Sequence, residues 1–154
     1  MTIIIEQAQL KDAAEILALQ KLAYLDEAAF YDDYTIPPLN QTLEETEAEF
    51  KDQLVLKTTL DGKIIGSVRA YMEEGTCFIG KLIVHPDHQN RGIGTRLMYE
   101  IENRFDQAER YELFTGYRSE RNLHLYRKLG YKPFRSQKIT DKVTLTFLEK
   151  HTRP

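Results

Sequence analysis

A glycine-containing segment between an apolar strand and an amphipathic helix constrains the fold of this chain more than any other feature. Residues 76–84 are rich in β-branched and aromatic side chains and predict a strand, which His85-Pro86 ends. After a short loop with Gly92 and Gly94, apolar side chains recur at every fourth position, at Ile93, Leu97, Ile101 and Phe105. This spacing predicts a helix with one buried side. A strand that leads directly into such a helix indicates a sheet covered by helices.

The rest of the chain predicts an α/β fold, a mixed sheet with helices on both faces. Further strands are expected at residues 2–6, 53–60, 63–71, 111–115, 131–134 and 143–148, and further helices at 13–24, 42–50 and 119–129. Asp61-Gly62 is a typical hairpin turn and joins two of these strands.

Two helix starts and one loop are indicated by local signals. Asp12 with Glu15 has the spacing of a capping box, and so has Thr42 with Glu45. Between these helices, the stretch from Tyr31 to Gln41 contains two adjacent prolines, and we expect an irregular loop there.

Composition limits the class of protein. The 154 residues, with 42% hydrophobic and 29% charged side chains, predict one globular domain over residues 1–154. Cys77 is the single cysteine, so no internal disulfide can form, and a cytoplasmic location is the expectation. No apolar run approaches the ~20 residues of a membrane helix, so we expect no membrane partner. The net charge of −3 does not favour nucleic acid as a partner.

The charges are unevenly distributed. Residues 22–50 hold no lysine or arginine but eight acids: Asp26, Glu27, Asp32, Asp33, Glu44, Glu45, Glu47 and Glu49. Residues 81–138 hold twelve lysines and arginines against seven acids. One interpretation is a site that receives a cationic substrate at one end and an anionic one at the other. The alternative is that these charges are only the solvated faces of amphipathic helices.

The glycine loop from Gln89 to Thr95 has the properties of a phosphate cradle. A helix start leaves backbone N–H groups without partners at the positive end of the helix dipole, and glycines let an anion approach them. Two other phosphate motifs are excluded. Leu97 stands where a dinucleotide fingerprint needs its third glycine, and the Walker-like run 75–82 ends in leucine instead of serine or threonine. A plain strand-to-helix turn remains the alternative.

Two motifs in order give the cradle a family context. Leu82-Ile83-Val84-His85-Pro86, followed by Gln89-x-x-Gly92-x-Gly94, resembles the acetyl-CoA motif of the GNAT N-acetyltransferase superfamily. The run from Asn122 through Tyr126 to Leu129-Gly130-Tyr131 is similar to the later helix of that family. The resemblance implies a mostly antiparallel central sheet and acetyl-CoA as acyl donor. It also implies a homodimer through the C-terminal strands.

The resemblance assigns roles to particular residues. It places pantetheine along the strand end, pyrophosphate on the glycine loop and further cofactor contacts on the later helix, at Leu82, Ile83, Val84, Gln89, Asn90, Arg91, Gly92, Ile93, Gly94, Thr95, Asn122, Tyr126 and Lys128. Tyr126 corresponds to the tyrosine that protonates the departing thiolate. Many members have asparagine where this chain has Ser119, and we expect Ser119 to cap the helix instead.

The acceptor side is less defined. A lysine-like amine has a pKa of about 10.4 and must lose a proton before it attacks, so a base is required. Glu27 is the leading candidate for the acceptor-site acid or the base, and Glu73, Glu74 and Glu112 are the others. The acidic N-terminal region favours a small cationic amine as acceptor.

Alternatives to this function remain open. The acceptor is otherwise the amine of a protein or peptide, or the chain is a sensor that binds coenzyme A without turnover. No metal is expected, because His85, Asp87 and His88 surround a proline turn and lack a fourth ligand.

Overall fold

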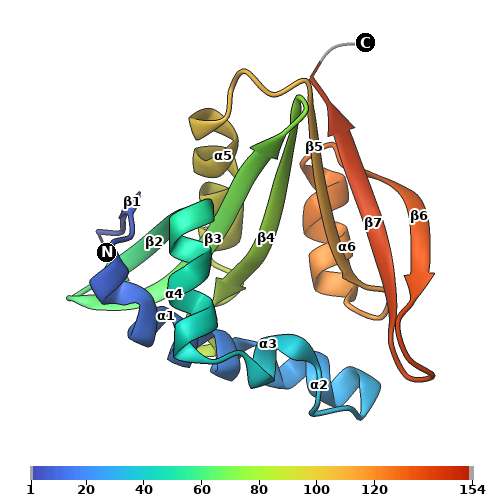
Figure 1. Ribbon diagram of the computed structural model, residues 1–154, viewed down its shortest axis with the longest axis horizontal. Helices are drawn as coiled ribbons and strands as arrows, with labels where there is room; N and C mark the ends of the chain where they lie inside the picture. The colour runs from blue at the N-terminus through green and yellow to red at the C-terminus, as the bar shows by residue number, and fades with distance from the viewer. Residues whose placement is uncertain (1, 153–154) are drawn as a thin grey trace.

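Seven strands form one sheet in the order β1-β2-β3-β4-β5-β7-β6 in the computed structural model, which describes residues 2–152 (Figure 1). The strands are β1 (Ile4–Gln7), β2 (Leu54–Leu60), β3 (Lys63–Glu73), β4 (Thr76–Val84), β5 (Arg110–Gly116), β6 (Lys132–Lys138) and β7 (Thr144–His151). Every neighbouring pair is antiparallel except β4 and β5, which are parallel. The expected mixed, mostly antiparallel sheet is therefore confirmed.

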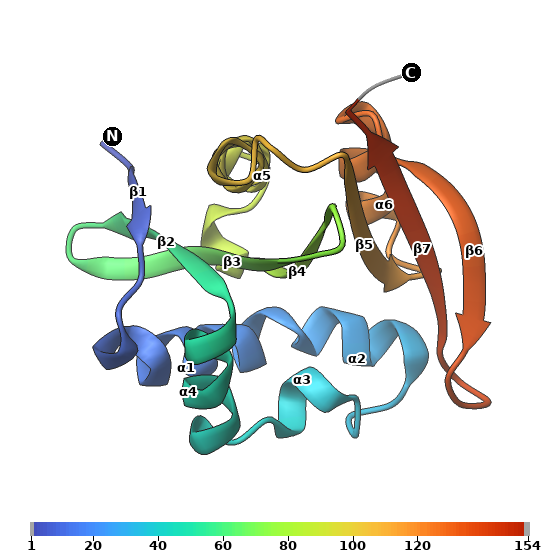
Figure 2. The same ribbon diagram turned by 45° about the horizontal axis from the view of Figure 1, so that its top comes forward.

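Helices cover both faces of the sheet, as expected. Figure 2 shows α5 and α6 on one face and α1 to α4 on the other. The helices are α1 (Ala13–Ala23), α2 (Leu25–Tyr31), α3 (Pro37–Asn40), α4 (Leu43–Asp52), α5 (Ile93–Arg104) and α6 (Glu120–Lys128), with short 3-10 turns at Leu10–Asp12 and Pro86–His88. Within residues 2–152, no helix is both long and apolar enough to cross a bilayer.

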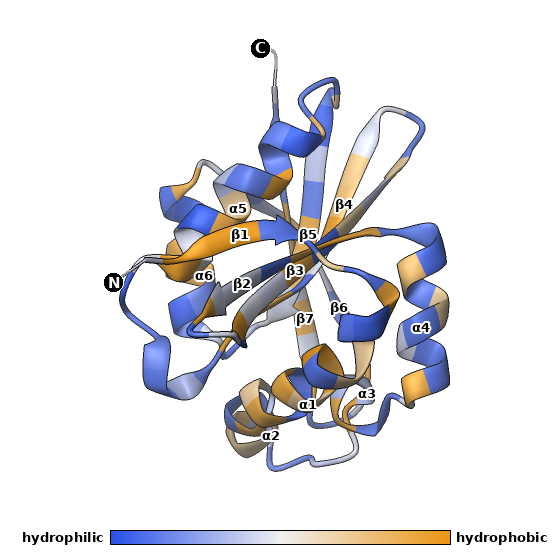
Figure 3. Cartoon of the chain, turned by 90° about the vertical axis from the view of Figure 1, so that its left-hand side faces the viewer, coloured by the Kyte–Doolittle hydropathy of each residue, from blue (hydrophilic) through white to orange (hydrophobic). Residues whose placement is uncertain are grey.

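The main core lies between α5 and the sheet. Ile93, Leu97 and Ile101, which define the predicted apolar side of α5, are all buried. Figure 3 shows hydrophilic and hydrophobic residues mixed along α4 and α5, as expected of helices with one side against the sheet and the other in water.

β4 and β5 separate along their length. Their parallel pairing is confined to Thr76–Phe78 with Arg110–Glu112, and Figure 1 shows the two strands diverging toward α1 and α2. The pairing of β3 with β4 also shifts register, because one residue between Ser67 and Arg69 faces two on β4. This bulge contains Lys81, whose φ is +50°. The β5-facing edge of β4 is consequently left without a strand partner beyond its first third.

Several local predictions are confirmed and others are wrong. The Thr42–Glu45 capping box forms, with hydrogen bonds of 2.9 and 3.1 Å. The Asp12–Glu15 box does not form. Asp12 accepts from the Gln9 backbone and from Lys57, and Glu15 accepts from the backbone of β3. Both carboxylates tie the start of α1 to the sheet, which local spacing cannot reveal.

The segment predicted as one irregular loop is partly helical. α2 runs to Tyr31, and a single helical turn, α3, begins at Pro37. Proline is favourable in the first turn of a helix, because it fixes φ and the N–H that it lacks has no helical partner there. Pro37 and Pro38 therefore mark the beginning of a helix as well as the end of a loop.

Candidate active site

Two cavities adjoin at the opening between β4 and β5. The first, here called the loop cavity, has a volume of about 300 Å³ and lies between the glycine loop, the end of β4, α6 and the α1–α2 corner. The second, here called the strand cavity, measures about 920 Å³ and lies between the diverging strands and helices α1 to α4. Tyr24, Glu27, Leu82 and Asn122 line both cavities. These four residues therefore mark the junction of the two cavities, where molecules bound in each of them would meet.

The start of α5 opens into the loop cavity. Gly92, at the N-cap, has φ +81°, and within residues 2–152 no side chain caps this helix. A Cβ at Gly92 would have no atom within 4 Å, so the space beside the first N–H groups is open. At Gly94 a Cβ would lie 3.4 Å from the Leu125 side chain, which shows how closely α5 approaches α6. The helix start is thus open and positively polarised, which are the properties that anion binding requires.

Most residues that the resemblance assigned to the cofactor do line the loop cavity. They are Leu82, Ile83, Val84, Gln89, Asn90, Gly92, Ile93, Gly94, Thr95, Asn122 and Lys128. Arg91 is exposed and does not line it, and Tyr126 lines the strand cavity instead.

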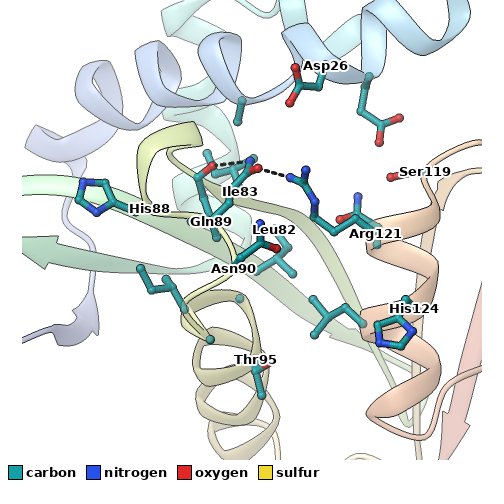
Figure 4. A pocket seen from close by; sticks show the side chains of 18 of the residues that line it. Asp26, Leu82, Ile83, His88, Gln89, Asn90, Thr95, Ser119, Arg121 and His124 are labelled. Carbon is teal, nitrogen blue, oxygen red and sulfur yellow. Dashed lines mark hydrogen bonds between the residues drawn. The ribbon is translucent and has the colours of Figure 1, made fainter.

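Arg121 is a lining residue that the sequence analysis missed. Figure 4 shows it reaching from α6 toward Gln89, whose side chain also points to the end of β4. The guanidinium donates to Gln89 Oε1, and Gln89 Nε2 donates to the Val84 carbonyl at 3.3 Å. Its position directly before Asn122 is the sequence signal that could have identified it. Arg121 and Lys128 place two cations on the α6 side of this cavity, and Asp26 and Glu27 place two carboxylates on the α2 side.

Glu27 lies on α2 at the junction of the two cavities. Burial raises the pKa of its carboxyl, the neighbouring Ser119 hydroxyl opposes the shift, and Asp26 adds to it. Ser119 occupies the N-cap position of α6, but its side chain makes no capping hydrogen bond to the described residues, so the predicted cap is wrong. The hydroxyl faces Glu27 because the opening between the strands brings α2 against the start of α6.

Tyr126 is buried on α6 and lines the strand cavity. Burial raises the pKa of its hydroxyl well above the usual range, and Tyr24 and Glu27 add to the effect. The hydroxyl is protonated at neutral pH, as that of an ordinary tyrosine is, and the raised pKa makes it a weaker acid. Tyr24, which sequence reasoning did not single out, is partly buried, and desolvation raises its pKa to about 12.

The other candidate bases are placed differently. Glu112 lines the strand cavity but pairs with Arg110 at 2.7 Å. Glu73 and Glu74 lie at the β3–β4 turn and are not among the described residues that line either cavity. Glu27 is the carboxylate that the fold brings to the junction.

A buried charged cluster forms one wall of the strand cavity. Glu49 on α4 accepts from Arg69 on β3 and from Lys81 at the β4 bulge, with Lys81 Nζ 2.6 and 2.9 Å from the carboxylate oxygens. Gln20 and Gln41 complete the network. The sequence signal was Arg69 itself, a lone arginine within the buried stretch of β3.

Comparison with known proteins agrees with this geometry. Residues 18–131 match the model of the acetyltransferase (GNAT) family. The chain belongs to the GNAT family. The resemblance found in the glycine loop and the later helix is thereby confirmed.

Solved GNAT structures share the whole fold. A GNAT-family acetyltransferase of Streptococcus pneumoniae is 24% identical, with a TM-score of 0.77 over 97% of this chain and 99% of that one. The PaiA N-acetyltransferase of Thermoplasma acidophilum, in complex with coenzyme A, is 17% identical, with a TM-score of 0.77 over 98% and 99%. The YncA acetyltransferase of Salmonella typhimurium, with acetyl-CoA, is 22% identical, with a TM-score of 0.75 over 100% and 96%.

A curated relative is longer than this chain. The UPF0157 protein YqkA of Bacillus subtilis is 27% identical over 134 residues, which make up 87% of this chain. The chain spans only 38% of the length of that protein.

Among residues 2–152 of this GNAT chain, no group of three or more histidine, cysteine or acidic side chains is arranged to hold a metal ion.

The buried charge of Glu27 carries a stability cost, which gives a first prediction. A carboxyl whose pKa is raised by folding binds its proton more tightly in the folded state than in the unfolded state. Its ionisation therefore destabilises the fold at pH values above 4.5, the ordinary pKa of the group. We expect Glu27→Gln to raise the melting temperature at neutral pH. The difference should shrink as the pH falls and vanish below about pH 4.5, as measured by thermal unfolding at several pH values. A melting temperature that is lower at neutral pH than that of the wild type would contradict it.

Proposed function

We propose that this GNAT chain is an N-acetyltransferase that moves the acetyl group of acetyl-CoA directly to an amine. The observation that carries the proposal is the meeting of the loop cavity and the strand cavity at Glu27 and Asn122, with Tyr126 on the strand-cavity side. Two substrates bound in adjoining cavities would bring their reacting atoms together there, which converts a bimolecular step into one within a complex. Membership of the family and the relatives solved with coenzyme A or acetyl-CoA support this reading.

The loop cavity fits coenzyme A. The uncapped N–H groups at the start of α5 and the open space at Gly92 suit a pyrophosphate, and Arg121 and Lys128 add positive charge. The free edge of β4 at Leu82–Val84 offers backbone groups to an amide-containing arm. When bound there, acetyl-CoA supplies an acetyl group already activated as a thioester.

Glu27 would accept the proton of the acceptor amine. Neutralising a lysine-like amine at pH 7 costs about 4.6 kcal/mol, so a positioned base contributes substantially. Burial raises the pKa of Glu27 and makes it a stronger base than an exposed glutamate. Its place at the junction puts it beside the position that the amine must reach.

Tyr126 would donate a proton to the departing thiolate. A thiol with a pKa near 8.5 leaves readily, so this help is moderate, about 10²-fold. We expect Tyr126→Phe to lower kcat by about that factor and to change the dissociation constant of acetyl-CoA much less. Stopped assays of turnover together with calorimetric titration measure both quantities, and equal turnover in the two proteins would rule out the role.

We take the acceptor to be a small amine. Pro37 and Pro38 of α3 line the strand cavity together with residues of the sheet, so a helix covers part of it. A small amine, cationic before it loses its proton, fits such a site better than an extended peptide. A homodimer through β6 and β7 stays an expectation of the resemblance.

The proposal is tested by thiol release from acetyl-CoA across polyamines, aminoglycosides, amino acids and short peptides, with calorimetric binding of acetyl-CoA in parallel. Release that depends on one class of amine is the expected result. Tight acetyl-CoA binding without release from any of these amines would favour a sensor that binds coenzyme A without turnover. Absence of binding would overturn the assignment of the glycine loop.

A further inference from the structure

On one wall of the strand cavity two cations share one carboxylate, and a second carboxylate, that of Glu45, lies farther from them. Arg69 and Lys81 share the single carboxylate of Glu49, and within residues 2–152 neither cation has another carboxylate at salt-bridge distance. Two cations and one carboxylate leave an excess of one positive charge. Glu45 contributes a more distant negative charge near Lys81, but its carboxylate is exposed and bound to the backbone of Thr42.

This excess is withdrawn from water. The Arg69 side chain is only 1% exposed, and its Nε has no hydrogen-bond partner among residues 2–152. Lys81 is 23% exposed, and burial lowers its pKa. A buried cation without full compensation costs several kcal/mol, so a ligand that supplies the missing anion would gain binding energy there.

Two cations on one carboxylate are not needed merely to fasten a helix to the sheet. Elsewhere in the same fold, Glu102 pairs with one cation among residues 2–152, Lys150, whose Nζ lies 2.6 and 2.8 Å from the carboxylate oxygens, and the Tyr131 hydroxyl also donates to it. One cation for one carboxylate is enough to fasten a helix to the sheet. The second cation at Glu49 is delivered by the β4 bulge, where Lys81 has an unfavourable φ of +50°. The fold thus accepts backbone strain in order to place a second positive charge on this wall.

The cluster lies near the reaction centre proposed above. Glu27, Arg69 and Lys81 all line the strand cavity. One molecule bound there could therefore place its amine at Glu27 and an anionic group at Arg69 and Lys81.

The remaining walls of the strand cavity are largely apolar. The rings of Tyr71 and Phe78 stack with centroids 5.3 Å apart, and those of Phe114 and Phe147 lie at the same separation. All four residues line the cavity. Such surfaces gain free energy by covering hydrocarbon or aromatic groups.

We propose that the acceptor is an amine that also carries a carboxylate on an apolar body, and that this carboxylate binds at Arg69, whose Nε has no partner among the described residues, and at Lys81, where it replaces the bond to Gln41 Oε1. The inference rests on the proposed function and narrows its substrate class to amino acids in the broad chemical sense. A carboxylate bound to a cation by charge-assisted hydrogen bonds gains about 1.5–3 kcal/mol, which corresponds to a preference of about tenfold to a hundredfold.

The test compares acceptors that differ only in the carboxylate. The probes are L-phenylalanine against 2-phenylethylamine and 5-aminopentanoate against pentylamine, because the pairs place the carboxylate at different distances from the amine. We expect kcat/KM to be at least about tenfold higher for one or both of the acids. Lys81→Met should reduce this preference by about tenfold, and Lys81→Arg, which keeps the charge, should retain most of it.

Lys150→Met is the matched control. Its side chain is 24% exposed and holds one carboxylate and one carbonyl oxygen, as Lys81 holds one carboxylate and one amide oxygen. It lies outside both cavities in the described chain, so its loss should leave the preference for acids intact.

Calorimetric titration of the same acids into the protein saturated with coenzyme A separates this inference from the proposed function. Acids that bind, with binding weakened by Lys81→Met but no acetyl transfer, would support the carboxylate site and refute the transferase. Transfer to the amines without preference for the acids would uphold the transferase and overturn the carboxylate site. Equal preferences in the wild type and Lys81→Met would also overturn it.

Discussion

Glu27→Gln is expected to lower kcat by about 10²-fold or more, while the dissociation constant of acetyl-CoA stays near that of the wild type. Glutamine keeps the shape of the side chain but cannot accept a proton, and a positioned base contributes about 10²- to 10⁴-fold. In the wild type, kcat/KM should fall as the pH drops through the raised pKa of Glu27. In the variant this part of the pH profile should be lost.

Glu112→Gln provides the control for this result. Glu112 lines the same strand cavity, but its carboxylate is paired with Arg110, which also holds Glu149. We expect a small effect on kcat and an unchanged pH profile. If the two variants lost equal activity, or if Glu112→Gln lost more, Glu27 would not be the base.

Gly92→Val is expected to weaken the binding of acetyl-CoA by about a hundredfold. The valine side chain would occupy the open space beside the first N–H groups of α5, where the pyrophosphate is proposed to lie. It would also strain the backbone, because φ at this position is +81°. Isothermal titration with acetyl-CoA measures this loss of affinity. We expect the lost affinity to impair function more than any change in the melting temperature does.

Gly62→Val separates the two effects. Gly62 lies in the β2–β3 turn with φ +79°, and a Cβ there also has no atom within 4 Å. The backbone strain is therefore similar, but the turn is not part of the loop cavity. Gly62→Val should lower the melting temperature to a similar extent and leave acetyl-CoA affinity unchanged. A similar loss of affinity in both variants would refute the phosphate cradle.

The predicted elements failed where local signals compete with distant contacts. Asp12 and Glu15 have capping spacing, yet each finds a partner on the sheet, at Lys57 and at the β3 backbone. Ser119 has the right position for a cap, yet its hydroxyl faces Glu27. In each case a short polar side chain had several partners of similar energy, and tertiary packing selected one.

The sequence alone determined the parts of this protein that depend on local geometry. The period of α5, the strand before it and the glycines between them predicted the helix-covered sheet and the anion site, because these follow from backbone conformation and side-chain spacing within about thirty residues. The acetyl-CoA motif and Tyr126 were identified in the same region.

Only the tertiary structure decided the acceptor side. Glu27 shares the loop cavity with Ser119 and the strand cavity with Tyr126 because β4 and β5 diverge and α2 packs across the opening, and no sequence pattern fixes that arrangement. Likewise, the acidic stretch predicted a cationic acceptor, but folding pairs Glu49 of that stretch with Arg69 and Lys81 and so brings two cations to the same wall. The charge of a site is the sum over elements that folding brings together, so it cannot be read from one segment of the chain.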